Sequence, residues 1–103
     1  MDNTAEDTQK FLNVQFEILK FLHKSSIKNY GKNTKLDITS FFSVQEIAKG
    51  SLIENKDETL RSLYILEGQK LVTPFPPGDF TSNNWCLTEI GANIANQIVK
   101  KAA

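Results

Sequence analysis

The pattern of hydrophobic positions predicts a long first helix, from about Asp7 to Lys24. At about 100° per residue, its apolar positions cover roughly 220° of the helix surface. That arc is wider than the stripe with which a surface helix joins one core. The helix is therefore expected either to lie at the centre of its own domain or to turn one flank towards a second subunit, and we favour the second subunit. The flank consists of Leu12, Phe16 and Leu19.

Two short helices are predicted next, each preceded by a capping residue. Ser43 and Glu46 have the spacing of a capping box, which opens a helix to about Lys49. Asn55 is a second cap, before a helix that runs to about Glu67. A tight, glycine-containing turn joins the two helices. Residues 43–67 are therefore expected to form a helix-turn-helix.

Two apolar strands and a last helix complete the pattern. The strands are expected at Leu71–Thr73 and Trp85–Leu87, so that a hairpin covers residues 71–87. Thr88 is expected to cap a helix to about Lys100. Three isoleucines share one face of that helix, namely Ile90, Ile94 and Ile98.

The segment 25–40 reads as a polar, lysine-rich connection. It contains a probable turn at 29–31 and a brief strand near 36–38. A connection of about 15 residues is long for a compact domain, which indicates either disorder or a functional role.

Composition places the chain among single-domain globular proteins. Its 103 residues are 40% hydrophobic and 23% charged, and residues 1–6 are expected to be a flexible N-terminus. No targeting segment and no apolar run of about 20 residues is visible, so we expect a cytoplasmic protein without a membrane span.

The sequence gives little support to catalysis, metal binding or a cofactor. Cys86 is the single cysteine and is expected to be a buried thiol rather than a redox sensor. His23 has no Cys, Asp or Glu at ligand spacing and is expected at the surface. No nucleophile-and-base set and no glycine-rich nucleotide loop appears, so we expect neither an enzyme nor a metal or cofactor site.

Two fragments resemble the winged helix-turn-helix regulators of the MarR-like and PadR-like groups. Leu66–Val72 is similar to the family's junction between helix and wing, and Leu87–Gly91 to its entry into the helix after the wing. The resemblance extends over residues 43–99. It implies an α+β winged helix-turn-helix with a three-helix core, a β-hairpin wing and a C-terminal amphipathic helix.

The chain departs from this family at two places. Lys70 stands where the family usually has glycine before Leu-Val, so Gly68 is expected to take the positive-φ position instead. The family wing commonly carries Arg or Lys at its tip, whereas residues 76–84 carry neither.

The resemblance makes residues 56–67 the recognition helix, whose outer face meets the major groove of DNA. Leu60, Leu63, Tyr64 and Leu66 are expected to face inward. The candidate DNA contacts are Lys56, Thr59, Arg61, Ser62 and Ile65 on the outer face, Gln45 and Lys49 in the preceding helix, and Lys28, Lys32 and Lys35 in the lysine-rich segment.

Each of these residues also has an ordinary structural interpretation. Arg61 has Asp57 and Glu58 within ion-pairing distance along the helix, and the lysines suit a solvated loop. The net charge is zero, with twelve basic and twelve acidic side chains, although residues 10–35 hold six lysines and one acid. A neutral protein can still present a positive face.

The expected function is that of a DNA-binding protein, either a small dimeric transcriptional regulator or a plasmid- or phage-type protein. Its homodimer interface is expected at Leu12, Phe16, Leu19, Ile98 and Val99. The alternative is a winged-helix protein-interaction module without DNA affinity. Its partner would meet the tip Phe75–Phe80, unless the two phenylalanines fold back under the hairpin.

Overall fold

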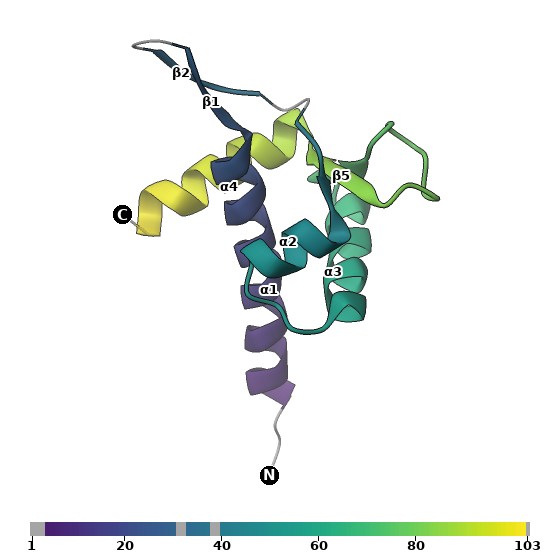
Figure 1. Ribbon diagram of the computed structural model, residues 1–103. Coiled ribbons are helices and arrows are strands. Elements are labelled where there is room, and N and C mark those ends of the chain that lie inside the picture. The colour runs from purple at the N-terminus through teal and green to yellow at the C-terminus, as the bar shows by residue number, and fades with distance from the viewer. Residues whose placement is uncertain (1–3, 31–32, 38–39, 103) are drawn as a thin grey trace.

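The computed structural model describes the backbone of residues 4–30, 33–37 and 40–102, and the side chains of residues 13–27, 36–37 and 40–101. Within these residues the chain is an α+β fold with four helices, a three-stranded antiparallel sheet and a separate two-stranded hairpin (Figure 1). The elements are α1 (Thr4–Ser26), β1 (Ile27–Tyr30), β2 (Asn33–Leu36), β3 (Phe42–Ser43), α2 (Val44–Gly50), α3 (Lys56–Gly68), β4 (Val72–Pro74), β5 (Asn84–Leu87) and α4 (Glu89–Ala102).

The sheet joins the hairpin near the C-terminus to a strand that precedes the two short helices. Its order is β3-β5-β4, with Phe42 opposite Trp85 and Val72 opposite Leu87. The strand expected near 36–38 lies earlier in the chain, since Leu36 is the last residue of β2. Residues 38–39 lie outside the described part, and the sheet strand begins at Phe42. The short β3 fixes the start of α2 against the sheet.

The segment expected to be a connection is a β-hairpin. α1 runs directly into β1, and β1 pairs with β2 in an antiparallel register that places Ile27 opposite Leu36 and Lys28 opposite Lys35. Figure 1 shows this β1–β2 hairpin projecting from the body of the molecule, away from the three-stranded sheet.

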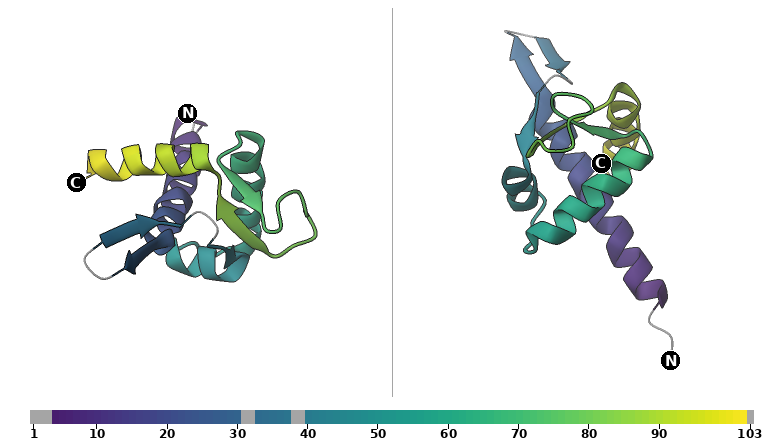
Figure 2. Two further views of the ribbon diagram at one scale, coloured as in Figure 1. Left: turned by 90° about the horizontal axis from the view of Figure 1, so that it is seen from above. Right: turned by 90° about the vertical axis from the view of Figure 1, so that its right-hand side faces the viewer.

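α1 supplies the centre of the core, and it begins earlier than predicted. Residues 4–6, expected to be flexible, belong to it, while residues 1–3 lie outside the described part. Its N-terminal half extends beyond the other elements (Figure 2). Its C-terminal half packs against α2, α3 and the sheet, with a core that includes Ile18, Leu19, Leu22, Ile47, Leu63, Leu66 and Trp85.

The predicted caps are confirmed. The Ser43 hydroxyl accepts from Glu46 N, and the Glu46 carboxylate accepts from Ser43 N, which completes the capping box. Asn55 Oδ1 accepts from Asp57 N at 2.8 Å at the start of α3. The positive φ expected at Gly68 is wrong, because Gly68 ends α3 and Lys70 holds φ 65°.

α4 packs mainly through its small residues, and of its isoleucines Ile98 also lies against the core. Gly91, Ala92 and Ala95 are buried, whereas Ile90 is 55% exposed. An added Cβ on Gly91 would stand 1.8 Å from the carbonyl oxygen of Leu71, so the absence of a side chain lets the two backbones approach. The predicted cap is confirmed, since Gly91 N donates to Thr88 Oγ1 at 2.9 Å.

Candidate functional site

The outward face of α3 differs from the predicted one. Lys56 and Arg61 are exposed and Ile65 is half-buried, as a contact face requires. Thr59 and Ser62, expected to face outward, are both 0% exposed. The helix is rotated so that Tyr64, expected to face inward, lies at the surface instead.

Both hydroxyls are buried inside the protein and are therefore inaccessible to DNA. Thr59 Oγ1 donates to the Asn55 carbonyl oxygen at 3.3 Å, a bond to the preceding helical turn. Ser62 Oγ has no hydrogen-bond partner. The amphipathic pattern alone did not reveal this, because a small hydroxyl residue fits either an exposed or a tightly packed position.

Arg61 keeps an available guanidinium. Neither Asp57 nor Glu58 forms an ion pair with it in the described part of the structure. The first two turns of α3 nevertheless carry two bases, Lys56 and Arg61, against those two acids, so their charges sum to zero. α3 by itself therefore offers the hydrogen-bond donors of Arg61 but no net positive charge.

The start of α2 is tied to the loop of the β4–β5 hairpin. Asn83 Nδ2 donates to Gln45 Oε1 at 2.7 Å, and Val44 N donates to the Asn83 carbonyl oxygen at 3.0 Å. The amide oxygen of Gln45 is therefore used within the fold. Lys49, in the last turn of the same helix, is exposed.

The β4–β5 loop is closed by its own hydrogen bonds and carries a negative charge. Ser82 Oγ donates to the Phe75 carbonyl oxygen at 2.6 Å. The Thr81 hydroxyl and, to a smaller extent, the Thr81 backbone N–H donate hydrogen bonds to Asp79. These bonds hold the pKa of the Asp79 carboxyl below its ordinary value. Asp79 is therefore ionised at neutral pH, which disfavours phosphate at this tip.

The two loop phenylalanines behave differently. Phe75 is half-buried and stacks on Phe41, with ring centroids 4.5 Å apart and an interplanar angle of 9°. Phe80 is 49% exposed and lies 6.3 Å from the ring of Tyr64. Tyr64 and Phe80 form an exposed aromatic surface, and Phe41 is also exposed; of these three the sequence interpretation had singled out only Phe80.

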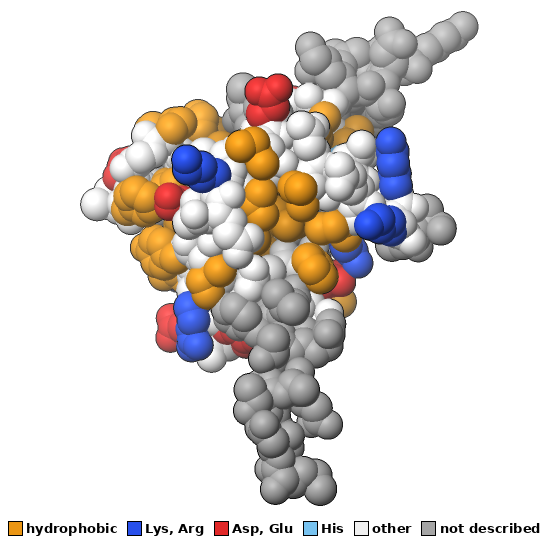
Figure 3. Space-filling model, turned by 180° about the vertical axis from the view of Figure 1, so that it is seen from behind, with side chains coloured by type: hydrophobic (Ala, Val, Ile, Leu, Met, Phe, Trp, Pro, Cys, Tyr) orange, Lys and Arg blue, Asp and Glu red, His pale blue; other side chains and the backbone are white. Residues whose placement is uncertain are grey.

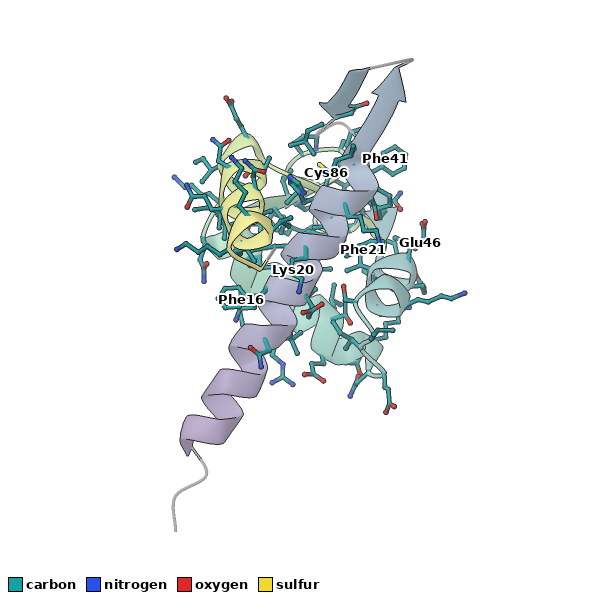
Figure 4. All side chains as sticks on the ribbon, turned by 90° about the vertical axis from the view of Figure 1, so that its left-hand side faces the viewer. Phe16, Lys20, Phe21, Phe41, Glu46 and Cys86 are labelled. Atoms are coloured by element: carbon teal, nitrogen blue, oxygen red, sulfur yellow. The ribbon has the colours of Figure 1, made fainter. Side chains whose placement is uncertain are left out.

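The predicted dimer flank is divided between core and surface. Leu19 is 2% exposed and belongs to the core, although it also lines the apolar groove beside Phe16. Phe16 and Val99 are exposed and Ile98 is half-buried, while the side chain of Leu12 lies outside the described part. Figure 4 shows Phe16 on the side of α1 nearest α4, and Phe21 on the side nearest α2.

An apolar groove lies between α1 and α4. Its volume is about 300 Å³, and its lining includes Phe16, Leu66, Leu71 and Ile94. Figure 3 shows hydrophobic side chains gathered on the face over which α4 runs. Ile90 and Ile94 are further exposed hydrophobic residues of α4, which the dimer prediction did not include.

The lysine-rich residues fall on the β1–β2 hairpin. Lys28 lies in β1 and Lys35 in β2, and the side chains of both lie outside the described part. Lys32, between the strands in sequence, lies outside it altogether.

The remaining candidates for chemistry are buried. Cys86 is a buried free thiol, as predicted, and burial raises its pKa. His23 is also buried, so its expected surface position is wrong. Over the described residues there is no cluster of three or more His, Cys, Asp or Glu arranged to hold a metal ion. No helix in the same part of the chain has the length and apolarity to cross a membrane.

Comparison with protein-family models, with curated proteins and with solved structures gives no match for this chain.

Proposed function

We propose that this chain is a winged helix-turn-helix domain of the MarR-like and PadR-like kind, which binds duplex DNA as a small dimeric regulator. The observation that carries the proposal is the strand order β3-β5-β4 around α2 and α3. A strand before the helix-turn-helix pairs with the returning strand of the hairpin that follows it. The β4–β5 hairpin is then the wing, and α3 is the recognition helix.

Three exposed side chains supply the DNA chemistry in this proposal. Arg61 has no ion-pair partner on its own helix and presents the two-pronged donor set that pairs with a guanine edge. Lys49 and Lys56 flank the turn between α2 and α3 and serve phosphates. Ile65, half-buried, lies at the edge of the contact. Thr59 and Ser62 lie outside the proposed interface because both are buried.

A two-fold dimer through the groove between α1 and α4 would present two copies of α3 to the DNA. In such dimers the recognition helices stand about one helical turn of DNA apart, roughly 34 Å. The exposed Phe16, Ile90 and Ile94 support an interface on this face.

The test is fluorescence anisotropy with labelled random duplex DNA, comparing the wild type with Arg61→Ala and Ser62→Ala. The two substitutions are neighbours on one helix, but only Arg61 is exposed. Arg61→Ala should weaken binding about 10-fold, the effect of losing a charged contact of about 1.4 kcal/mol. Ser62→Ala should bind as the wild type does. The proposal fails if the wild type shows no binding at low salt.

A second candidate, a protein-interaction module, is favoured by the aromatic surface of Tyr64 and Phe80 and by the exposed Phe41. An ionised Asp79 at the same tip also suits a protein better than a phosphate backbone. This function would be indicated if a Phe80→Ser variant lost a specific protein partner while the wild type bound no DNA.

A further inference from the structure

The β1–β2 hairpin stands apart from the face made by α3 and the wing. It continues the C-terminal end of α1 and projects past the three-stranded sheet, as both views of Figure 2 show. Asp37 N donates to the Ser26 carbonyl oxygen at 2.8 Å and closes the base of the hairpin on the end of the helix. The hairpin is therefore an arm anchored to the central helix of the core.

This arm is the most positive part of the chain. Residues 18–36 contain five lysines and no Asp or Glu, although Lys20 forms an ion pair with Glu17 and Asp37 closes the base of the hairpin. Lys24, in the last turn of α1, is exposed and leads directly into β1. In Figure 1 the turn between α2 and α3 lies away from this arm, and residues 49–61 around it carry three acids and three bases. The zero net charge thus hides a local excess of positive charge on this part of the chain.

The register of the hairpin brings two of these lysines together. Lys28 and Lys35 are direct partners across the two strands. Like charges directly opposite each other destabilise an antiparallel pair. Their pairing therefore adds nothing to the stability of the hairpin but concentrates positive charge at one register position, as an anion-binding element requires.

We propose that the β1–β2 hairpin is a second DNA-binding element, with Lys24, Lys28 and Lys35 contacting backbone phosphates beside the segment read by α3. This inference rests on the proposed DNA-binding function. A two-stranded β-ribbon has the width to enter the major groove of B-DNA or to lie along its edge. The hairpin supplies the electrostatic attraction that the neutral outer face of α3 lacks.

The experiment measures the affinity for random duplex DNA as a function of salt, from about 50 to about 200 mM. Lys28→Gln/Lys35→Gln is compared with Lys100→Gln/Lys101→Gln, which removes the same two charges at the exposed end of α4. The hairpin variant should have a plot of log affinity against log salt that is shallower by about 1.8, the effect of two lost phosphate contacts. The α4 variant should keep the wild-type slope.

Two further measurements separate the outcomes. Circular dichroism checks the fold of the hairpin variant; should it be unfolded, Lys24→Gln replaces it, with an expected change in slope of about 0.9. Vesicles containing phosphatidylserine test an anionic membrane as the alternative surface. Vesicle binding that depends on Lys28 and Lys35, with DNA binding unchanged, would overturn the inference.

The inference and the proposed function fail in different ways. If the wild type and the hairpin variant bind DNA with equal slopes while Arg61→Ala is impaired, the hairpin is not a DNA-binding element and the winged-helix proposal stands. If the wild type binds no DNA at about 50 mM salt, both are wrong.

Discussion

Lys70 holds a left-handed backbone conformation, with φ 65°, between the end of α3 and the start of β4. A side chain in this region crowds its own carbonyl group, at a cost of about 1–2 kcal/mol, and glycine avoids that cost. The family that the chain resembles usually has glycine here. The surrounding hydrogen bonds keep the conformation, since Lys70 N donates to the Glu67 carbonyl oxygen and its own carbonyl oxygen accepts from the Thr88 hydroxyl.

Replacing Lys70 with glycine is therefore expected to stabilise the protein by about 1 kcal/mol, because only the strain is removed and both backbone bonds remain. Urea denaturation measures the change in the free energy of unfolding, provided that its dependence on urea concentration is the same for both proteins. Gln69→Gly is the matched control; its φ is −90°, so glycine gains nothing there and is expected to lower the midpoint. A lower midpoint for Lys70→Gly would contradict the expectation.

Because of Cys86, the folded protein is expected to lose stability at alkaline pH. The pKa of the Cys86 thiol is raised in the folded state by burial, so the unfolded chain loses the thiol proton at a lower pH than the folded protein. Stability from this group is complete below the unfolded pKa, about 8.5, and falls as the pH rises through the folded value. Urea midpoints at neutral pH and at about pH 10 should therefore diverge more for the wild type than for Cys86→Ala. Equal divergence would assign the alkaline loss to other groups.

At the scale of elements, the docking of α4 depends on Gly91. Its missing Cβ is the reason that the α4 backbone reaches the Leu71 carbonyl group, which also accepts from Thr88 N at 3.1 Å. The close approach holds the last helix against the junction between α3 and β4.

Gly91→Ala is expected to destabilise the fold by about 3 kcal/mol, because the methyl group meets backbone and α4 must move as a whole. Gly68→Ala is the control, since a Cβ there meets no atom within 4 Å and alanine favours the helix. Thermal unfolding of the two variants makes the comparison, and similar midpoints would show that α4 tolerates displacement.

The sequence predicted where the helices begin better than it predicted which of their faces are buried. Ser43, Asn55 and Thr88 identified three helix starts, because a cap requires only neighbouring backbone N–H groups. The orientation of α4 escaped prediction because close approach favours Gly91 and Ala95 over the more hydrophobic isoleucines. Hydrophobicity ranks side chains by transfer from water, whereas helix docking also selects them by size.

The β1–β2 hairpin escaped prediction for a related reason. Its strands, Ile27–Tyr30 and Asn33–Leu36, contain lysine and asparagine in place of the alternating apolar residues that mark a half-buried strand. A hairpin that projects from the body has no buried face to leave such a pattern. The candidate site was also predicted only in part. The sequence showed that lysines are concentrated in this segment, but only the strand register shows that Lys28 pairs with Lys35.

At the scale of the whole molecule, the groove between α1 and α4 leads us to expect a homodimer. Ile94→Glu would place a charge in that groove, whose lining is largely apolar, and is expected to convert the dimer to monomers. Phe80→Glu introduces the same charge on the aromatic surface and should leave the dimer intact. Sedimentation velocity over a range of concentrations distinguishes the two. A monomeric wild type would exclude the groove as a dimer interface.

The five lysines of residues 18–36 give this electrically neutral chain an uneven distribution of charge. A uniform field exerts no net force on such a molecule but does exert a torque. Near a polyanion, the five lysines of residues 18–36 turn forward before any contact forms. Orientation, rather than net attraction, would then limit how fast the chain finds its site, and added salt would slow the encounter by releasing the molecule to tumble freely.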